Sequence, residues 1–251
     1  MCLKIFKKLF NKKVINNMNN DISAVVIGME KSKFAGRCAG AEYDATRINT
    51  LLSGITPNLV FLKNENATKD AVKTAFKNAV KNKIAIFYYS GHGANQKFST
   101  TGPEEADGKD DFLCLYDTYM LDNEIWEILK SANGRVFLVF DCCHSSDMFR
   151  VEVPFSVSNE KSTRETASGK TLYVESNEVN AIQWAGCHES TVSWGSSTGG
   201  MFTNAFLKYY NSTLSYNELW NKIANDKTLL ASEIPYQVII GKSFIDNKIF
   251  S

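Results

Sequence analysis

The feature that most constrains the fold is an alternation of short apolar runs with segments of helical spacing. The runs are rich in β-branched and aromatic residues, and several lack a polar face, which is typical of strands buried on both sides. They occupy residues 22–29, 58–63, 83–89, 112–117, 135–140, 180–187 and 236–241. Strands alternating with helices predict an α/β fold with one mostly parallel central sheet and helices on both faces.

Five intervening segments carry apolar residues three or four positions apart, a spacing that builds one apolar helix face. These segments are 42–54, 68–82, 121–132, 201–210 and 216–226. Thr68 and Ser215 stand where a side-chain oxygen can cap the first turn of a helix. The stretch 156–171 is rich in Ser, Thr, Glu and Lys, and we expect an exposed loop or linker there because the strand–helix pattern resumes after it.

The overall composition excludes few functions, but the charge is unevenly placed. A net charge of +1 gives no basic surplus that would favour nucleic acid as a partner. Residues 1–20 hold five lysines and no acid. The segment 1–15 could form a basic amphipathic helix at a membrane surface, although a poorly ordered leader is the favoured interpretation. It has no continuous apolar core, so we expect neither a signal peptide nor a membrane span, and a cytoplasmic protein.

The six cysteines do not form the pattern of a disulfide scaffold or a zinc site. They stand at positions 2, 38, 114, 142, 143 and 187, scattered along 251 residues and without a CxxC pair. Adjacent cysteines such as Cys142 and Cys143 do not have the spacing of structural zinc ligands. We therefore expect a reducing compartment, in which at least one thiol is free to react.

Two of the apolar runs end in chemically reactive residues. The run 83–89 is followed by SGHG, with His92, and the run 135–140 by DCCHSS, with Asp141 and Cys143. Strand ends of a parallel sheet meet at the edge where ligands bind. Alone, a strand-end cysteine is usually a buried apolar residue and a histidine in a glycine turn is usually structural. Together at one edge they favour a thiol nucleophile assisted by an imidazole.

These motifs resemble those of metacaspases, cysteine peptidases with the caspase-like (caspase–haemoglobinase) fold, and in particular their bacterial members. YYSGHG and DCCHSS place His92 and Cys143 at a separation of 143 − 92 = 51 residues, close to the spacing of about 50 in caspases. The resemblance covers most of 21–241. It includes EYDATRINTLL, DGKDDFLCLYD, LDNEIWEIL and CHESTVSWGSSTGGMFTNAFL.

The resemblance implies a division of the chain and a set of catalytic roles. After the basic leader 1–20, residues 21–251 would form one peptidase domain. Its large-subunit-like part would be 21–155, its linker 156–171 and its small-subunit-like part 172–251. His92 would be the catalytic imidazole and Cys143 the nucleophile, and the backbone N–H groups of Gly93 and Cys143 would bind the oxyanion.

A specificity pocket follows from charge and from the same resemblance. Asp141 stands two residues before Cys143, and the resemblance adds Asp44 and Ser90 to the pocket. Two carboxylates without a basic partner repel each other, and an incoming guanidinium or ammonium relieves that repulsion. The prediction is cleavage of protein or peptide substrates after Arg or Lys, and not after Asp. For Asp44, a helix-surface acid is the competing interpretation.

The polar stretch carries candidate sites of self-cleavage. If the enzyme prefers basic residues, Lys161, Arg164 and Lys170 become cleavable positions, since processing between the large and small parts is common in the relatives that the chain resembles. Solvated loop charges are an equally weighted interpretation.

Calcium is a further implication of the resemblance. Ca²⁺ needs six to eight oxygen ligands, and Asp107 and Asp122 are weak candidates within an acid-rich region. Yet Asn123 stands where relatives often have a second Asp, and Arg150 lies near an expected acid. We therefore expect no required cofactor, and calcium dependence is doubtful.

Other classes of function remain open. The chain could be a catalytically silent caspase-fold interaction module, or a zymogen active only after a trigger. A different cysteine hydrolase on a similar sheet is the nearest competitor. A nucleotide-binding domain is a weak alternative, because GMEKS (28–32) lacks the spacing of a phosphate-binding loop.

Overall fold

The computed structural model describes residues 18–96, 110–142, 163–166, 169–186, 198–230 and 234–251. Its largest element is an eight-stranded sheet. The strands are β1 (Ile22–Gly28), β2 (Asn58–Lys63), β3 (Ile84–Ser90), β7 (Arg135–Asp141), β8 (Thr163–Thr166), β9 (Gly169–Val174), β10 (Ala181–Ala185) and β11 (Tyr236–Ile240). Their order across the sheet is β2-β1-β3-β7-β10-β11-β9-β8.

The sheet is mostly parallel, as the continuously apolar runs predict. Strands β2, β1, β3, β7 and β10 pair in parallel, and β9 pairs in parallel with β11. Only the β10–β11 and β8–β9 pairs in this sheet are antiparallel. In β1 and β3 every residue is buried, which agrees with strands covered on both faces.

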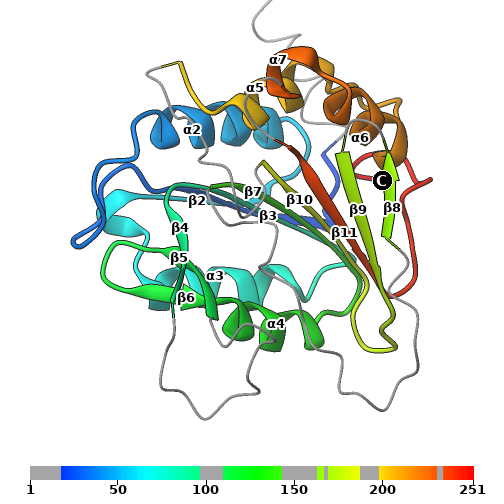
Figure 1. Ribbon diagram of the computed structural model, residues 1–251. Helices are drawn as coiled ribbons and strands as arrows, with labels where there is room; N and C mark the ends of the chain where they lie inside the picture. Colours follow the sequence, from blue (N-terminus) through cyan, green and yellow to red (C-terminus); the bar gives the residue numbers. More distant parts are fainter. Residues whose placement is uncertain (1–17, 97–109, 143–162, 167–168, 187–197, 231–233) are drawn as a thin grey trace, which may run out of the picture.

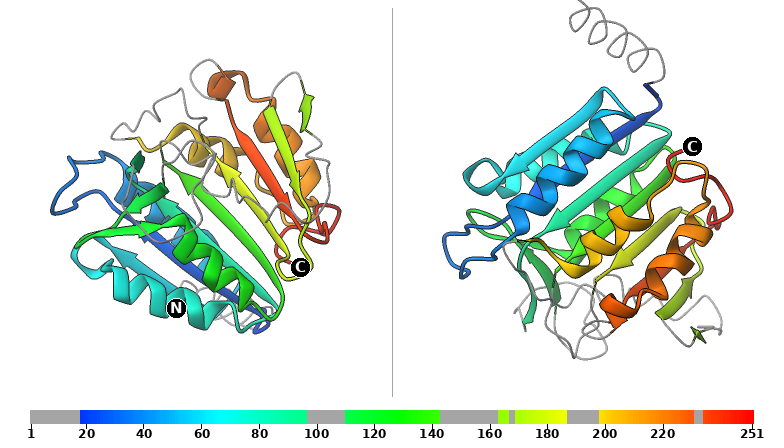
Figure 2. Two further views of the ribbon diagram at one scale, coloured as in Figure 1. Left: turned by 60° about the horizontal axis from the view of Figure 1, so that its bottom comes forward. Right: turned by 90° about the horizontal axis from the view of Figure 1, so that it is seen from above.

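Helices cover both faces of the sheet (Figure 1). They are α2 (Ala41–Ser53), α3 (Lys69–Ala79), α4 (Asp122–Lys130), α5 (Met201–Tyr209), α6 (Tyr216–Ala224) and the short α7 (Lys227–Leu230), with a 3-10 turn at Asn64–Asn66. Figures 1 and 2 show α3 and α4 on one face and α2, α5 and α6 on the other. The predicted fold class is confirmed.

Two of the helix starts form as their sequences predict. The Thr68 side chain accepts a hydrogen bond from the Ala71 N–H at 3.4 Å and caps α3. The Ser215 side chain accepts from the Glu218 N–H at 3.2 Å, and the Glu218 carboxylate accepts from the Ser215 N–H at 2.7 Å. This reciprocal pair is a capping box, so two N–H groups that the helix itself leaves unpaired are satisfied at the start of α6.

One apolar run belongs to a second, smaller sheet. Strands β4 (Gly93–Gln96), β5 (Asp110–Cys114) and β6 (Tyr119–Leu121) form a three-stranded antiparallel sheet. The run 112–117 therefore contributes to β5 and not to the central sheet. Its apolar residues Phe112, Leu113 and Leu115 are nonetheless buried. The apolar character of the run therefore did not indicate which sheet it would join.

The polar stretch 156–171 is not a continuous exposed loop. Residues 163–166 form β8, and β9 begins at Gly169, so a hairpin adds two strands to the edge of the central sheet. The loop prediction is therefore wrong for these residues. Polar residues suit an edge strand because one side of it has no neighbouring strand.

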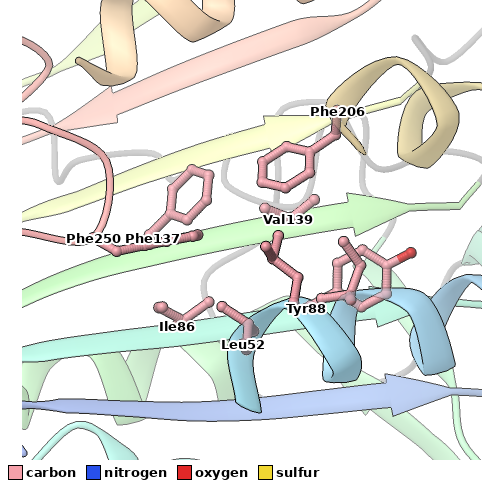
Figure 3. A pocket seen from close by; sticks show the side chains of 9 residues that line it. Leu52, Ile86, Tyr88, Phe137, Val139, Phe206 and Phe250 are labelled. Atoms are coloured by element: carbon pink, nitrogen blue, oxygen red, sulfur yellow. The ribbon is translucent and has the colours of Figure 1, made fainter. Parts of the chain in front are cut away.

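The two faces of the sheet bury separate apolar clusters, since successive side chains of a strand point to opposite faces. Phe87 and Tyr89 of β3 join the cluster under α3 and α4. Phe137 of β7 joins the other cluster, where its ring meets Trp184 edge-on with centroids 4.8 Å apart. A cavity of about 10 Å³ in this second cluster is lined by Leu52, Phe206 and other apolar side chains (Figure 3). It holds at most one water, so it is part of the core.

No helix in the described part of the chain combines the length and the apolar character that crossing a membrane requires.

Replacing Phe137 with Ala tests the aromatic core. The side chain is 1% exposed and contacts Trp184 and Tyr216, so its loss should lower the free energy of unfolding by about 3–5 kcal/mol in urea titrations. Val60→Ala on β2 is the control, because that side chain is 39% exposed and should change stability by less than about 1 kcal/mol. Equal effects of both substitutions would contradict this account of the core.

Candidate active site

The candidate site lies where β3 and β7 end side by side. The two strands pair in parallel along their whole length, with Ser90 opposite Asp141 at the carboxyl ends. Just beyond, the Gly91 N–H donates to the Asp141 backbone carbonyl at 3.4 Å. The sheet therefore brings together the SGHG and DCC motifs, which are about 50 residues apart in sequence.

The turn that carries His92 is fixed by hydrogen bonds to its backbone. The His92 carbonyl accepts from the Cys114 N–H at 2.9 Å and from the Tyr89 hydroxyl at 2.8 Å. A side chain at Gly91 would place its Cβ 2.5 Å from the Tyr89 hydroxyl oxygen, so this position requires glycine. The imidazole Nε2 is buried and has no hydrogen-bond partner among the described residues, which leaves this nitrogen available for proton transfer.

The predicted nucleophile, Cys143, lies outside the described residues and stays a prediction, as does its share of the oxyanion site; Gly93, the other predicted donor, begins β4. Cys142, which directly precedes Cys143 in sequence, is fully buried among apolar residues. Burial also raises the pKa of the Cys114 thiol to about 11, so Cys114 stays protonated at neutral pH. Neither Cys142 nor Cys114 has the environment of a reactive thiolate.

The structure brings the three predicted pocket residues together. Asp44 on α2, Ser90 on β3 and Asp141 on β7 are 1%, 3% and 4% exposed. The two carboxylates are near enough to act on the same tyrosine. The pKa of Tyr88 is raised mainly by its burial and further by the charges of Asp44 and Asp141. The surface-acid interpretation of Asp44 is therefore wrong.

Both carboxylates accept hydrogen bonds from the start of α5. The Gly200 N–H donates to Asp44 Oδ2 at 2.6 Å. Asp141 Oδ2 accepts from the Thr203 N–H at 3.0 Å and from the Thr203 hydroxyl at 2.5 Å. A helix N-terminus favours negative charge because its first N–H groups are unpaired within the helix, so α5 partly compensates the burial of two acids.

Two glycines allow this close approach. A Cβ at Gly199 would lie 2.1 Å from Asp44 Oδ1, and one at Gly200 would lie 2.3 Å from Asp141 Oδ2. Gly199 also has φ of +92°, which side chains rarely tolerate. Sequence reasoning missed this contact, although a Gly-Gly pair directly before a helical segment was a visible signal.

A tyrosine and a threonine extend the network into the core. The Thr203 hydroxyl donates to Asp141, so the Tyr88 hydroxyl must be the donor in the 2.6 Å bond between Tyr88 and Thr203. Figure 3 shows the Tyr88 ring lining the apolar cavity while its hydroxyl points away from the other labelled side chains. Tyr88 and Thr203 are further site residues that the sequence pattern did not reveal.

Asp44 also forms an ion pair within its own helix. Arg47 Nη2 contacts Asp44 Oδ1, one turn along α2. Despite this partner, burial and the neighbouring Asp141 carboxylate raise the pKa of Asp44 to about 7; the Gly200 N–H and Arg47 act in the opposite direction. These donors therefore do not offset the cost of burying the Asp44 charge beside a second carboxylate.

The other predicted residues that the structure describes are not part of this cluster. Lys161 and Asp107 lie outside the described residues, Arg164 lies in β8 and Lys170 in β9. Asp122 begins α4 and accepts from the Asn123 N–H at 2.7 Å. Within the described ranges, His, Cys, Asp and Glu do not gather in groups of three that could hold a metal. The expectation that no cofactor is required and the candidate sites of self-cleavage stay predictions.

The arrangement of strands and helices is that of the caspase fold. The structure aligns with that of a protein from Geobacter sulfurreducens with a TM-score of 0.68 at 20% identity, covering 91% of this chain and 98% of the other. It aligns with Caspase-1 from Spodoptera frugiperda with a TM-score of 0.57 at 11% identity, covering 93% and 94%. At these identities the alignments establish the fold alone.

Sequence comparison establishes the family. The model of the caspase domain matches residues 22–229, and the chain therefore belongs to the caspase-domain family of cysteine peptidases. It is 26% identical to Metacaspase-5 of Trypanosoma brucei brucei over 155 residues, which are 53% of this chain and 30% of that protein. It is 32% identical to Metacaspase-3 of Trypanosoma cruzi over 95 residues, which are 34% and 25%. The chain thus matches about a third or less of the length of these relatives.

The raised pKa of Asp44 predicts a pH-dependent stability. Between the unfolded value of 3.8 and the folded value of about 7, the folded protein binds the extra proton, so the free energy of unfolding falls as pH rises through this window. Asp44→Asn removes the proton-binding group and keeps an oxygen that can accept from Gly200. From pH 5 to pH 7.5, wild type should lose stability relative to Asp44→Asn, by at most about 1.4 kcal/mol per pH unit.

Urea titrations at several pH values measure this difference. Asp21→Asn is the matched control, because Asp21 pairs with Lys83 at the opposite end of the sheet and its side chain is 54% exposed. Parallel stability curves for wild type and Asp44→Asn would contradict the account of a destabilised buried acid.

Proposed function

We propose that the protein is a cysteine endopeptidase that uses Cys143 and His92 to cleave peptide bonds after Arg or Lys. The observation that carries this proposal is the gathering of Asp44, Ser90 and Asp141 immediately beside the turn of His92. Membership of the caspase-domain family supports the peptidase chemistry, and the acid cluster supports the choice of a basic substrate side chain.

The chemistry follows from the two reactive groups. His92 accepts the proton of the Cys143 thiol, and the thiolate attacks the carbonyl carbon of the scissile bond. The backbone N–H groups of Gly93 and Cys143 stabilise the oxyanion that develops. His92 then donates its proton to the leaving amine, and water hydrolyses the thioester to release the acid product and restore the thiol.

The proposed selectivity rests on charge. Two carboxylates in one buried cluster repel each other. Burial and this repulsion together raise the pKa of Asp44 to about 7. A guanidinium or ammonium group entering the cluster would stabilise both ionised carboxylates. An aspartate side chain would add a third negative charge, so cleavage after Asp is disfavoured.

One observation favours a latent form that requires a trigger. Asp44 and Asp141 are almost completely buried and already accept hydrogen bonds from α5. A substrate side chain must therefore gain access to carboxylates that the fold covers. Movement at the start of α5 would open them, which makes a zymogen step the second candidate.

Fluorogenic peptides ending in Arg, Lys or Asp test the catalytic proposal. Turnover should occur after Arg and Lys and vanish in Cys143→Ala. Cys142→Ala is the matched control: it replaces the adjacent, fully buried cysteine and should retain activity. Parallel reactions with calcium and with chelator test the metal, and limited proteolysis before the assay tests for a latent form. Cleavage after Asp alone, or loss of activity only in Cys142→Ala, would refute the assignment.

Replacing Asp141 with Asn tests the pocket. Removing one charge from the recognition of a guanidinium should reduce kcat/KM for an Arg peptide by roughly 30- to 160-fold, as for a lost charge-assisted hydrogen bond of about 2–3 kcal/mol. A citrulline peptide, which has nearly the same shape and no charge, should be affected much less. Equal losses for both peptides would show that Asp141 supports the fold and does not read the substrate charge.

A further inference from the structure

Arg47 forms the outer side of the acid cluster. Its guanidinium pairs with Asp44, whose side chain is only 2% exposed, while the side chain of Arg47 itself is 25% exposed. The arginine therefore lies between the buried carboxylate and solvent. In the described structure it holds the kind of contact that a basic substrate side chain would make.

The guanidinium is held from two further directions. It lies over the ring of Tyr43, with Cζ 4.6 Å from the ring centroid. A Cβ at Gly199 would be 2.5 Å from Arg47 Nη2, so the glycine backbone passes close to the same nitrogen. Arg47 Nε is buried and has no hydrogen-bond partner among the described residues. The arginine is thus positioned by one carboxylate and one exposed aromatic ring, while its Nε–H group has no acceptor among the described residues.

The charges of the cluster suggest a purpose for this residue. When ionised, Asp44 and Asp141 contribute two negative charges and Arg47 contributes one positive charge, which leaves a net charge of −1. One arginine or lysine side chain of a substrate would neutralise that remainder. The charged and titratable groups that contact Asp44 or act on it are Arg47 of α2 and Asp141 of β7, with Tyr88 of β3 close by.

We propose that Arg47 is a specificity-determining residue that competes with the basic side chain of the substrate for Asp44. The inference rests on the proposed cleavage after Arg or Lys and adds a residue that limits the affinity for such substrates. A substrate cation either displaces the Arg47 guanidinium toward solvent or shares the carboxylate with it. In both cases the positive charge of Arg47 raises the KM for basic substrates.

A merely structural ion pair makes a different prediction. The loss of a purely structural pair would leave the buried Asp44 carboxylate without its partner and lower stability, without changing the discrimination between charged and neutral substrates. Competition instead changes KM, and only for substrates with a positive charge at the cleaved residue.

The test compares Arg47→Gln with wild type on Arg and citrulline peptides. Removing a positive charge beside the binding position should lower KM for the Arg peptide roughly threefold to tenfold, leave kcat nearly unchanged, and leave the citrulline peptide unaffected. Arg47→Lys retains the charge and should restore a KM close to that of wild type. Arg135→Gln is the matched control, because Arg135 begins β7 at the opposite end from Asp141 and binds the Ser251 carbonyl at 2.5 Å.

A second variant keeps the test informative if Arg47→Gln does not fold. Tyr43 is 50% exposed, so Tyr43→Ala should fold, weaken the support of the guanidinium and lower KM in the same direction by a smaller factor. An unchanged or higher KM for the Arg peptide in both variants, with wild type active on it, would overturn this inference alone. Absence of cleavage after Arg and Lys in wild type and every variant, before and after limited proteolysis, would overturn the proposed function and this inference with it.

Discussion

The parallel pairing of β3 with β7 is the constraint on which the rest of the site depends. It sets Ser90 opposite Asp141 and so decides that the turn of His92 begins where the strand before Cys143 ends. A shift of one residue would turn Ser90 and Asp141 to the other face of the sheet. Such a shift is opposed by the packing on both faces of the sheet, because it would exchange residues between two well-filled apolar clusters.

The second essential interaction joins the acids to α5. Asp44 and Asp141 belong to α2 and β7, and Gly200 and Thr203 come from the start of α5, in the last quarter of the chain. These hydrogen bonds therefore hold segments that are far apart in sequence together at the site itself. Because buried carboxylates need donors more than exposed ones do, the same acids that are proposed to bind substrate also stabilise the folded arrangement. Both acids are buried and the pKa of Asp44 is raised, which is the cost of placing them there.

Much of this structure was predictable from local pattern. Apolar runs located β1, β3, β7, β10 and β11, and side-chain oxygens located the caps at Thr68 and Ser215, because these features depend on neighbours in sequence. The hairpin β8–β9 was missed because its polar residues suit an edge strand as well as a loop. The contact of Gly200 with Asp44 spans 156 positions, and no periodicity reports such a pairing. Arg47 stands three positions after Asp44 on one helix, a spacing that permits an ion pair, whereas the sequence-based expectation was of two carboxylates without a basic partner.

The electrostatics of the cluster unite these observations. One arginine and the N-terminus of one helix do not fully compensate two buried carboxylates, as the pKa of about 7 for Asp44 shows. A fully compensated pair would be more stable but would gain little from another cation. An uncompensated pair would repel itself more strongly and retain a proton to a higher pH than the observed cluster. The intermediate state retains part of the negative charge in a low-dielectric setting, where a single added cation has its greatest effect. Partial neutralisation is therefore what would allow this acid cluster to serve both the fold and the proposed recognition of a basic residue.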